Sequence, residues 1–222
     1  MGKNRSGNAV IQFCEKIEWQ PKTVIIAGVG VRGTEVELMR QAWDDCEIYG
    51  FEPNPLTYQS WVRRESTFPG MLINSALGAF EGLATLRFRP QHKDGGSLAG
   101  LAEGPSASAT VDVATLNSFF RRFEKAQGLE ECLLWLDCEG SEHRILQGLI
   151  GEGFEKKIPV INVEMTGIPP ADGWAEPVQI HTWMRDFGYH RRWVHTTRIN
   201  RAQYDAIYVR NDRNFNPRIR MW

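Results

Sequence analysis

The feature that most constrains the fold is a short apolar segment that ends in a run of spaced glycines. Residues 23–33 read TVIIAGVGVRG, which places Gly28, Gly30 and Gly33 directly after an apolar run. An apolar run bounded by glycine is typical of a buried parallel strand. A strand, a glycine turn and a helix together bring bare backbone and a helix N-terminus close to a nucleotide ligand. The segment therefore predicts a nucleotide-binding turn at the first strand–helix junction.

An acidic residue after the next apolar run sharpens this prediction. Residues 47–51 form that run, and Glu52 follows it directly. A carboxylate at this place accepts hydrogen bonds from both ribose hydroxyls of a bound nucleoside. Together with the glycine turn, Glu52 indicates a cofactor that contains adenosine.

The composition excludes several classes of function. The 222 residues are 42% hydrophobic and 24% charged, as in a globular domain with a substantial core. The net charge of −1 gives no general attraction to nucleic acid or to anionic membranes. No apolar stretch approaches the roughly 20 residues of a membrane span. The four cysteines have neither zinc-ligand nor disulfide-framework spacing. We therefore expect a cytoplasmic protein without nucleic-acid or membrane partners and without a metal.

Helical and strand patterns alternate along most of the chain, which predicts a three-layer α/β fold. Helices are expected at residues 10–19, 34–43, 56–64, 114–127, 140–149 and 178–187. After the first two runs, strands are expected at residues 71–77, 82–90, 110–113, 132–136, 158–164, 189–195 and 203–210. The last two strands are close enough in sequence to form an antiparallel hairpin. Residues 91–108 are expected to form a long loop of the kind that serves as a lid, and residues 166–177 a second long loop.

A series of motifs resembles the FkbM family of S-adenosylmethionine-dependent methyltransferases. From residue 23 to residue 210 the motifs read AGVGVRGTE, FEPNP, INSALG, GGSL, LDCEGSEHRILQGL, INVEM and QYDAIYVR. FEPNP and LDCEGSE are the specific ones, whereas the glycine turn is common to many nucleotide-binding folds.

The resemblance implies an architecture and a reaction. We expect one class I methyltransferase domain over residues 1–222, with an N-terminal helix in residues 1–20 and a tail at 211–222. Its Rossmann-like sheet is expected to have seven mostly parallel strands, with an antiparallel strand in the C-terminal hairpin. The cofactor would be S-adenosyl-L-methionine, and the acceptor a hydroxyl of a sugar or small natural product. The oligomeric state stays open, with a homodimer as one candidate.

The resemblance also implies which residues contact the cofactor. The expected contacts are Gly28, Gly30 and Gly33 under the methionine part, Glu52, Pro53 and Asn54 at the ribose, Ser75 and Ala76 along adenine, and Asp137. The chain departs from the family at the end of the first strand. An acid normally stands there to hold the cofactor's ammonium group, and this chain has Ile26 and Ala27 instead. Asp137 is the nearest replacement in the expected fold.

Two carboxylates follow the most hydrophobic predicted strand, residues 132–136. Asp137 and Glu139 stand at the carboxyl edge, where α/β proteins bind ligands, and buried charge is costly without a use. Methyl transfer requires a hydroxyl that is positioned and deprotonated. We expect Asp137 to face the cofactor and Glu139 to face the acceptor. Glu142 is expected to interact favourably with the dipole at the N-terminus of the next helix, and Ser141 is expected to cap that helix.

Four further polar residues are candidates for the same site. His143 follows Glu139 by four positions and is expected to share its helix face as a third catalytic residue. Glu164 ends the next strand and is expected to enter the same cleft. Ser97 resembles the family's lid serine, and with Glu164 and His181 it makes up the expected acceptor side.

Two other functions fit part of the pattern. Glu52 follows Gly33 by 19 positions, which meets the fingerprint of a nicotinamide-binding oxidoreductase. The sequence shows no Tyr-x-x-x-Lys motif, however, and the terminal hairpin is unexpected in that class. The missing acid at Ile26 also leaves open a non-catalytic nucleotide-binding module.

Overall fold

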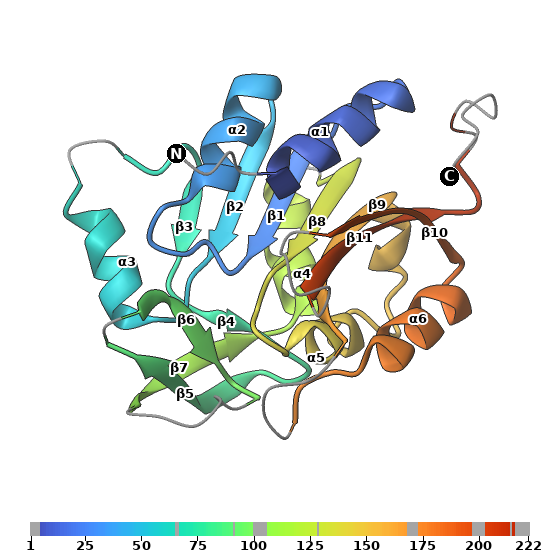
Figure 1. Cartoon of the computed structure of the whole chain (residues 1–222). Helices are drawn as coiled ribbons and strands as arrows, with labels where there is room; N and C mark the ends of the chain where they lie inside the picture. The colour runs from blue at the N-terminus through green and yellow to red at the C-terminus, as the bar shows by residue number, and fades with distance from the viewer. Residues whose placement is uncertain are drawn as a thin grey trace.

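The larger of two β-sheets has the strand order β10-β11-β9-β8-β1-β2-β3 (Figure 1). The structure is a computed structural model that describes residues 5–64, 67–90, 92–99, 106–127, 129–167, 173–196, 203–213 and 215. The strands of this sheet are β1 (Thr23–Ala27), β2 (Glu47–Phe51), β3 (Met71–Ile73), β8 (Cys132–Leu136), β9 (Val160–Thr166), β10 (Tyr189–Thr196) and β11 (Gln203–Arg210). All neighbours pair in parallel except β11, which is antiparallel to β9 and to β10. The predicted seven-stranded, mostly parallel sheet with a C-terminal hairpin is confirmed.

Helices cover both faces of this sheet and make three layers. On one face lie α1 (Arg5–Lys16), α2 (Thr34–Ala42) and α3 (Pro55–Val62), which share one hydrophobic cluster with the sheet. On the other lie α4 (Leu116–Gln127), α5 (Glu142–Gln147) and α6 (Pro177–Asp186), which share the second cluster. A short 3₁₀ helix, η1 (Phe154–Lys157), precedes β9. Among the described residues, no helix has the length and apolar character that crossing a membrane requires.

The central strand β8 shows why an uninterrupted apolar run in the sequence predicts a strand that is buried on both faces. All five of its residues are buried. Leu133 and Trp135 pack into the cluster under α1 and α2, whereas Leu134 and Leu136 pack into the cluster under α4 and α5. Since both faces are covered, the strand has no polar alternation. Its end therefore delivers the next residues directly to the edge of the sheet.

A second, four-stranded sheet was not predicted. Its order is β4-β7-β5-β6, with β4 (Ala76–Leu77), β5 (Gly82–Arg89), β6 (His92–Ser97) and β7 (Ala107–Ala114). The single strand expected at residues 71–77 is wrong, because β3 stays in the larger sheet and β4 joins the small one. The loop expected at 91–108 is wrong where β6 and the start of β7 lie, and residues 100–105 lie outside the described part. Figure 1 shows the small sheet, in green, beside the ends to which β1 and β2 point.

Two helix boundaries differ from the prediction for a backbone reason. The first helix ends at Lys16 instead of residue 19, because Glu18 has a φ of +54°. The helix expected at 140–149 spans only Glu142–Gln147, because Glu139 and Gly140 have φ values of +52° and +95°. Left-handed residues do not continue a right-handed helix. The second case shapes the site described below.

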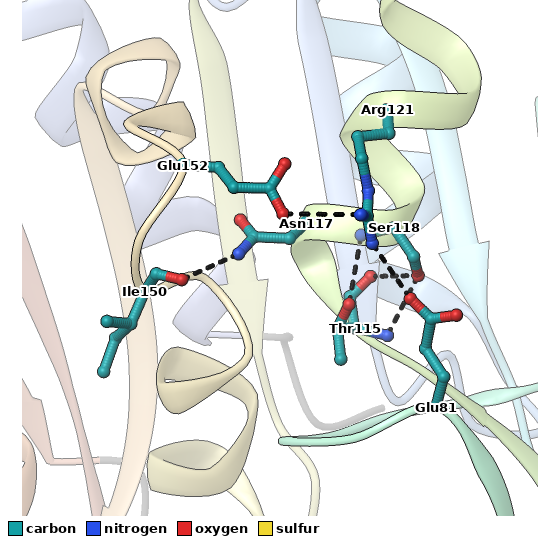
Figure 2. A network of polar contacts seen from close by, with 7 residues as sticks. All are labelled: Glu81, Thr115, Asn117, Ser118, Arg121, Ile150 and Glu152. Carbon is teal, nitrogen blue, oxygen red and sulfur yellow. Dashed lines mark hydrogen bonds and ion pairs between the residues drawn. The ribbon is translucent and has the colours of Figure 1, made fainter.

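A polar network holds the start of α4 against its neighbours (Figure 2). The amide of Ser118 donates to Thr115 Oγ1 at 3.0 Å, and the amide of Thr115 donates to Ser118 Oγ at 3.2 Å. Asn117 Nδ2 donates to the carbonyl of Ile150 at 2.9 Å. The bonds between Thr115 and Ser118 satisfy backbone groups that a helix end leaves without partners, and the bond to Ile150 ties the start of α4 to the segment after α5.

Candidate active site

A cavity of about 480 Å³ opens at the carboxyl edge of the larger sheet. The glycine turn after β1 and the loop after β2 form one side, and the residues after β8 and near the end of β9 form the other. Leu86 and Leu98, in β5 and just after β6, add an apolar wall. This volume is in the usual range for a small-molecule site, and the place is where α/β sheets bind ligands.

The glycine turn brings bare backbone to the cavity wall. Gly28 has a φ of +86°, and a Cβ there would lie 1.9 Å from the carbonyl oxygen of Asp137. Gly33 has a φ of +55°, and a Cβ there would lie 2.2 Å from the ring of Trp61. No other residue type fits these two positions without movement of the backbone or of the ring. Gly28, Gly30 and Gly33 all line the cavity.

Glu52 is held at the cavity by backbone amides on both sides. Its carboxylate accepts hydrogen bonds from the amide of Gly30 at 2.9 Å and from the amide of Asn54 at 2.8 Å. The residue is 5% exposed and lines the cavity. Trp61 Nε1 donates to the carbonyl of Gly30 at 2.8 Å, so the turn is fixed from α3 as well. The carboxylate is therefore placed before any ligand binds, which suits it to accept from ribose hydroxyls.

Asn54 provides a test of whether an adenosine cofactor fits. Its Oδ1 accepts from the amide of Leu56 at 3.0 Å and caps α3. Its Nδ2 is buried and has no partner among the described residues, and the residue lines the cavity beside Pro53. A buried donor without a partner is costly, and an oxygen or nitrogen of a bound nucleoside would satisfy it. The cavity therefore fits the cofactor that the sequence indicated.

The residues after β8 form a loop that is held in a left-handed conformation. The Glu142 carboxylate accepts from the amides of Cys138 at 2.8 Å and Gly140 at 3.3 Å. Ser97 Oγ donates to the carbonyl of Glu139 at 2.6 Å. Positive φ is unfavourable for a residue with a side chain, so such contacts are needed to maintain Glu139 at the cavity. Glu142 thus holds this loop, a role that the helix-dipole explanation did not include.

Ser141 differs from its prediction. The residue makes no side-chain cap for α5, so the expectation of a helix cap is wrong. It is 3% exposed, it lines the cavity, and its Oγ has no partner among the described residues. Sequence reasoning assigned it to the helix because serine is a common cap. The left-handed residues before it turn it toward the cavity instead.

Strand register places four carboxylates and a glycine in one row along the sheet edge. The pairings of β1 with β2 and β8 put Gly28 between Glu52 and Asp137, one step beyond the last paired residues. The pairing of β8 with β9 continues the row from Asp137 to Glu164. Glu164 in turn is opposite Asp205 of β11. The row thus crosses five neighbouring strands, and we call Asp137, Glu164 and Asp205 the acid row.

The acid row retains a proton at neutral pH. Burial raises the pKa of Asp137 well above its usual value, and the charges of Glu164, Glu139 and Asp205 raise it further. Burial raises the pKa of Glu164 to about 8, although a hydrogen bond with Asp137 lowers it. In this bond the protonated Asp137 donates to the Glu164 carboxylate. Such proton sharing is expected where buried carboxylates lie side by side.

Most of the remaining predicted residues lie outside the cavity wall. Ala76 is the exception and lines the cavity. Ser75 is not in the wall, and its hydroxyl instead hydrogen-bonds to the carbonyls of Ala76 and Asp112. His143 is half-buried on α5 and is not in the wall, and burial lowers its pKa. His181 forms a hydrogen bond with the hydroxyl of Tyr208, away from the cavity.

Several lining residues were not singled out from the sequence. They are Arg32, Glu35, Leu86, Leu98, Ser141 and Gln203. Only the small sheet and the C-terminal hairpin bring Leu86, Leu98 and Gln203 to the cavity, so no local motif marked them. Among the described residues, no group of three or more His, Cys, Asp or Glu is placed to hold a metal ion.

The glycine turn, the fixed ribose-side acid and the seven-stranded sheet with its antiparallel last pair define a class I methyltransferase. The sequence matches the FkbM methyltransferase domain over residues 25–191. The chain belongs to that family and is an S-adenosylmethionine-dependent methyltransferase. This assignment rules out the two alternative functions, a nicotinamide-binding oxidoreductase and a non-catalytic nucleotide-binding module.

Solved structures share the fold at low sequence identity. The plantazolicin methyltransferase BpumL with a monoazolic desmethylPZN analog and SAH has a TM-score of 0.52 and 7% identity, covering 93% of this chain and 82% of that one. The METTL16 methyltransferase domain has a TM-score of 0.51 and 7% identity, covering 95% and 69%. Magnesium protoporphyrin IX methyltransferase of Synechocystis PCC 6803 with SAM has a TM-score of 0.48 and 11% identity, covering 93% and 78%. None of the curated proteins matches the sequence significantly.

Proposed function

We propose that the enzyme methylates a hydroxyl oxygen of a sugar or small natural product. The observation that carries this proposal is the placement of Glu139. A left-handed backbone brings this carboxylate into the cavity wall, beside the edge residues of β8 and β9. A carboxylate beside the acceptor is what removal of a hydroxyl proton requires.

In this proposal the two halves of the cavity have different tasks. The bare backbone of Gly28 and Gly30 lies under the methionine part of the cofactor, and Glu52 and Asn54 bind the ribose. Ala76 lies along adenine, and Asp137 takes the place of the missing acid at Ile26. The acceptor lies on the other half, against Glu139 and Glu164.

The chain's own residues position the acceptor and remove its proton. S-adenosylmethionine, when bound, supplies a methyl group on a positively charged sulfur that leaves readily. Glu139 holds the acceptor hydroxyl and accepts its proton, which prepares the oxygen to take the methyl group that the cofactor would supply. The apolar wall of Leu86 and Leu98 excludes water from the reacting atoms. Ser97 and Glu142 position the loop that carries Glu139. His143 as a catalytic residue and His181 as an acceptor contact are weaker candidates, because neither lies in the cavity wall.

The acceptor class rests on the lining of the cavity. Carboxylates suit hydrogen bonds with several hydroxyl groups, and Leu86 and Leu98 suit the C–H face of a sugar or the body of a natural product. We place the enzyme in the cytoplasm, because its four cysteines are free, as in a reducing compartment.

The test is Glu139→Gln in a methyl-transfer assay with a panel of hydroxylated sugars and natural products. We expect kcat to fall by about 10²–10⁴-fold, while S-adenosylhomocysteine binds with unchanged affinity by calorimetry. Glu15→Gln, on the exposed side of α1, is the matched control and is expected to have no effect. Full turnover by Glu139→Gln would exclude Glu139 as the base, and methylated nitrogen or carbon in the product would exclude O-methylation.

A further inference from the structure

The loop that carries Glu139 is also held by the segment that precedes α6. In this segment, Ala175 donates its amide to the carbonyl of Gly140 at 3.1 Å. The indole ring of Trp174 lies against Gly140, where a Cβ would be 2.3 Å from the ring atom Cδ2. Gly140 also has a φ of +95°, which residues with a side chain rarely adopt. The position next to the proposed base therefore requires glycine for two reasons, its backbone conformation and the ring that covers it.

These contacts hold Gly140 together with its neighbour. The amide of Gly140 donates to the Glu142 carboxylate at 3.3 Å, and its carbonyl accepts from Ala175. The carbonyl of Glu139 accepts from Ser97 Oγ at 2.6 Å. A left-handed residue with a side chain persists only where its surroundings over-determine it. Here β6, α5 and the segment before α6 all contribute to holding the pair.

Two of these segments also contact each other. Gly173 has a φ of +87°, and a Cβ there would lie 2.9 Å from the carbonyl oxygen of Ala99. The amide of Ala99 in turn donates to Ser97 Oγ at 3.0 Å. The segment before α6 and the chain that leaves β6 therefore meet at the loop that carries Glu139, and a shift of either one reaches that loop.

Trp174 packs on this loop and not in the core. The residue is half-buried, and none of the three hydrophobic clusters of the described residues includes it. Its ring borders a small space that Gly140, Glu142 and Glu164 also border. An aromatic ring stabilises mainly through the area that it covers. The packing of Trp174 therefore acts on the residues that hold the proposed base.

We propose that Trp174 is a positioning residue, which keeps Glu139 and Gly140 in the left-handed conformation that directs the Glu139 carboxylate toward the acceptor hydroxyl. The proposal rests on the proposed function, in which Glu139 accepts the hydroxyl proton. Trp174 does not line the cavity, so it acts through the loop and not through a ligand. Loss of its ring therefore lowers the rate of methyl transfer and leaves the binding of cofactor and acceptor intact.

Steady-state kinetics with S-adenosylmethionine and the best acceptor of the panel above tests this role. We expect Trp174→Ala to lower kcat at least about tenfold, with the KM of the acceptor and the affinity for S-adenosylhomocysteine unchanged. Trp174→Phe keeps a flat ring against Gly140 and is expected to retain kcat within about threefold. Trp19→Ala is the matched control, because Trp19 is also half-buried and its Nε1 bonds to Glu131, outside the cavity. The control is expected to retain kcat.

A double-mutant cycle tests whether the ring acts through Gly140. Gly140→Ala places a methyl group where the ring lies, and Trp174→Ala frees that space. We expect each single variant to lower kcat, and the double variant to lower it no further than Gly140→Ala alone, because the two residues are in contact. Losses that multiply in the double variant would show that the two residues act independently, which would overturn the proposal.

Amide hydrogen exchange measured by NMR separates this role from the proposed function, because it needs no acceptor. We expect the amides of Gly140 and Ala175 to exchange faster in Trp174→Ala than in the wild type or in Trp19→Ala. Exchange at the wild-type rate, or a raised KM with unchanged kcat, would overturn the proposal. If exchange is faster but Glu139→Gln retains full turnover, the proposed function fails, whereas the hold of Trp174 on the loop is confirmed.

Discussion

Ser97 Oγ donates a 2.6 Å hydrogen bond to the carbonyl oxygen of Glu139. The bond joins the last residue of β6, in the small sheet, to the left-handed residue that carries the proposed base. The same hydroxyl accepts from the amide of Ala99 at 3.0 Å, so it also fixes the chain where it leaves β6. The orientation of Glu139 thus depends on a sheet that lies beside the main one.

We expect Ser97→Ala to lower kcat by about tenfold, because removing one hydrogen bond of roughly 1 kcal/mol loosens the backbone of Glu139. Calorimetry is expected to show an unchanged affinity for S-adenosylhomocysteine. Ser118→Ala is the matched control, since Ser118 Oγ also donates to a backbone carbonyl, that of Thr115, and neither residue lines the cavity. An equal loss of kcat in both variants would show that Ser97 acts only through stability.

Gly28→Ala is expected to abolish cofactor binding, because the new Cβ would lie 1.9 Å from the carbonyl oxygen of Asp137. The backbone of the turn must then move away from the position that admits the cofactor. Gly188→Ala controls for backbone strain, since Gly188 has a similar φ of +76° and open space around it. The control is expected to lose about 1 kcal/mol of stability and no binding. Equal cofactor affinity in the two variants would contradict the close-approach argument.

The free energy of unfolding is expected to fall as pH rises from 5 to 8. Burial raises the pKa of Glu142 from 4.5 to about 7. A carboxyl with a higher pKa in the folded state stabilises the fold below its unfolded pKa and loses that contribution as pH rises through the folded one. Glu142→Gln retains the acceptor oxygen and removes the titration, so the decline should shrink by on the order of 2–3 kcal/mol. Urea unfolding at several pH values measures this decline in the free energy of unfolding. Parallel plots of that free energy against pH for the wild type and the variant would refute the prediction.

The network at the start of α4 (Figure 2) is expected to stabilise the folded protein through the helix cap and not through the ion pairs of Arg121. Arg121 forms ion pairs with Glu81 at 3.1 Å and Glu152 at 3.6 Å, and its side chain is 56% exposed. Arg121→Ala is therefore expected to cost at most about 0.5 kcal/mol. Thr115→Ala removes the acceptor for the Ser118 amide and is expected to cost about 1 kcal/mol. Urea unfolding that ranks the two variants in the opposite order would refute this.

The sequence predicted the parts of the fold that depend on local pattern. The apolar run of β8 and the glycine turn after β1 each carry their signal within a few residues, as does the hairpin of β10 and β11. Gly28 and Glu52, which line the cavity, could be singled out for the same reason. Their spacing along the chain is set by one strand–turn–helix unit.

The sequence did not reveal what depends on distant partners. The small sheet was missed because β4 and β7 pair across more than thirty residues, and β6 lies in a stretch rich in Gly and Ser. Ser141 was read as a cap because nothing local shows that Glu139 and Gly140 are left-handed. Asp205 stood in the QYDAIYVR motif, but only strand register places it opposite Glu164.

A crystal structure of the protein with S-adenosylhomocysteine tests the central claim most directly. We predict both ribose hydroxyls within hydrogen-bonding distance of the Glu52 carboxylate, with Asn54 Nδ2 paired to the nucleoside. The sulfur atom should face the gap between Gly28 and Glu139, so that a methyl group on it would point toward the acid row. Density for the ligand at any other place, or an empty cavity at saturating ligand concentration, would contradict this account.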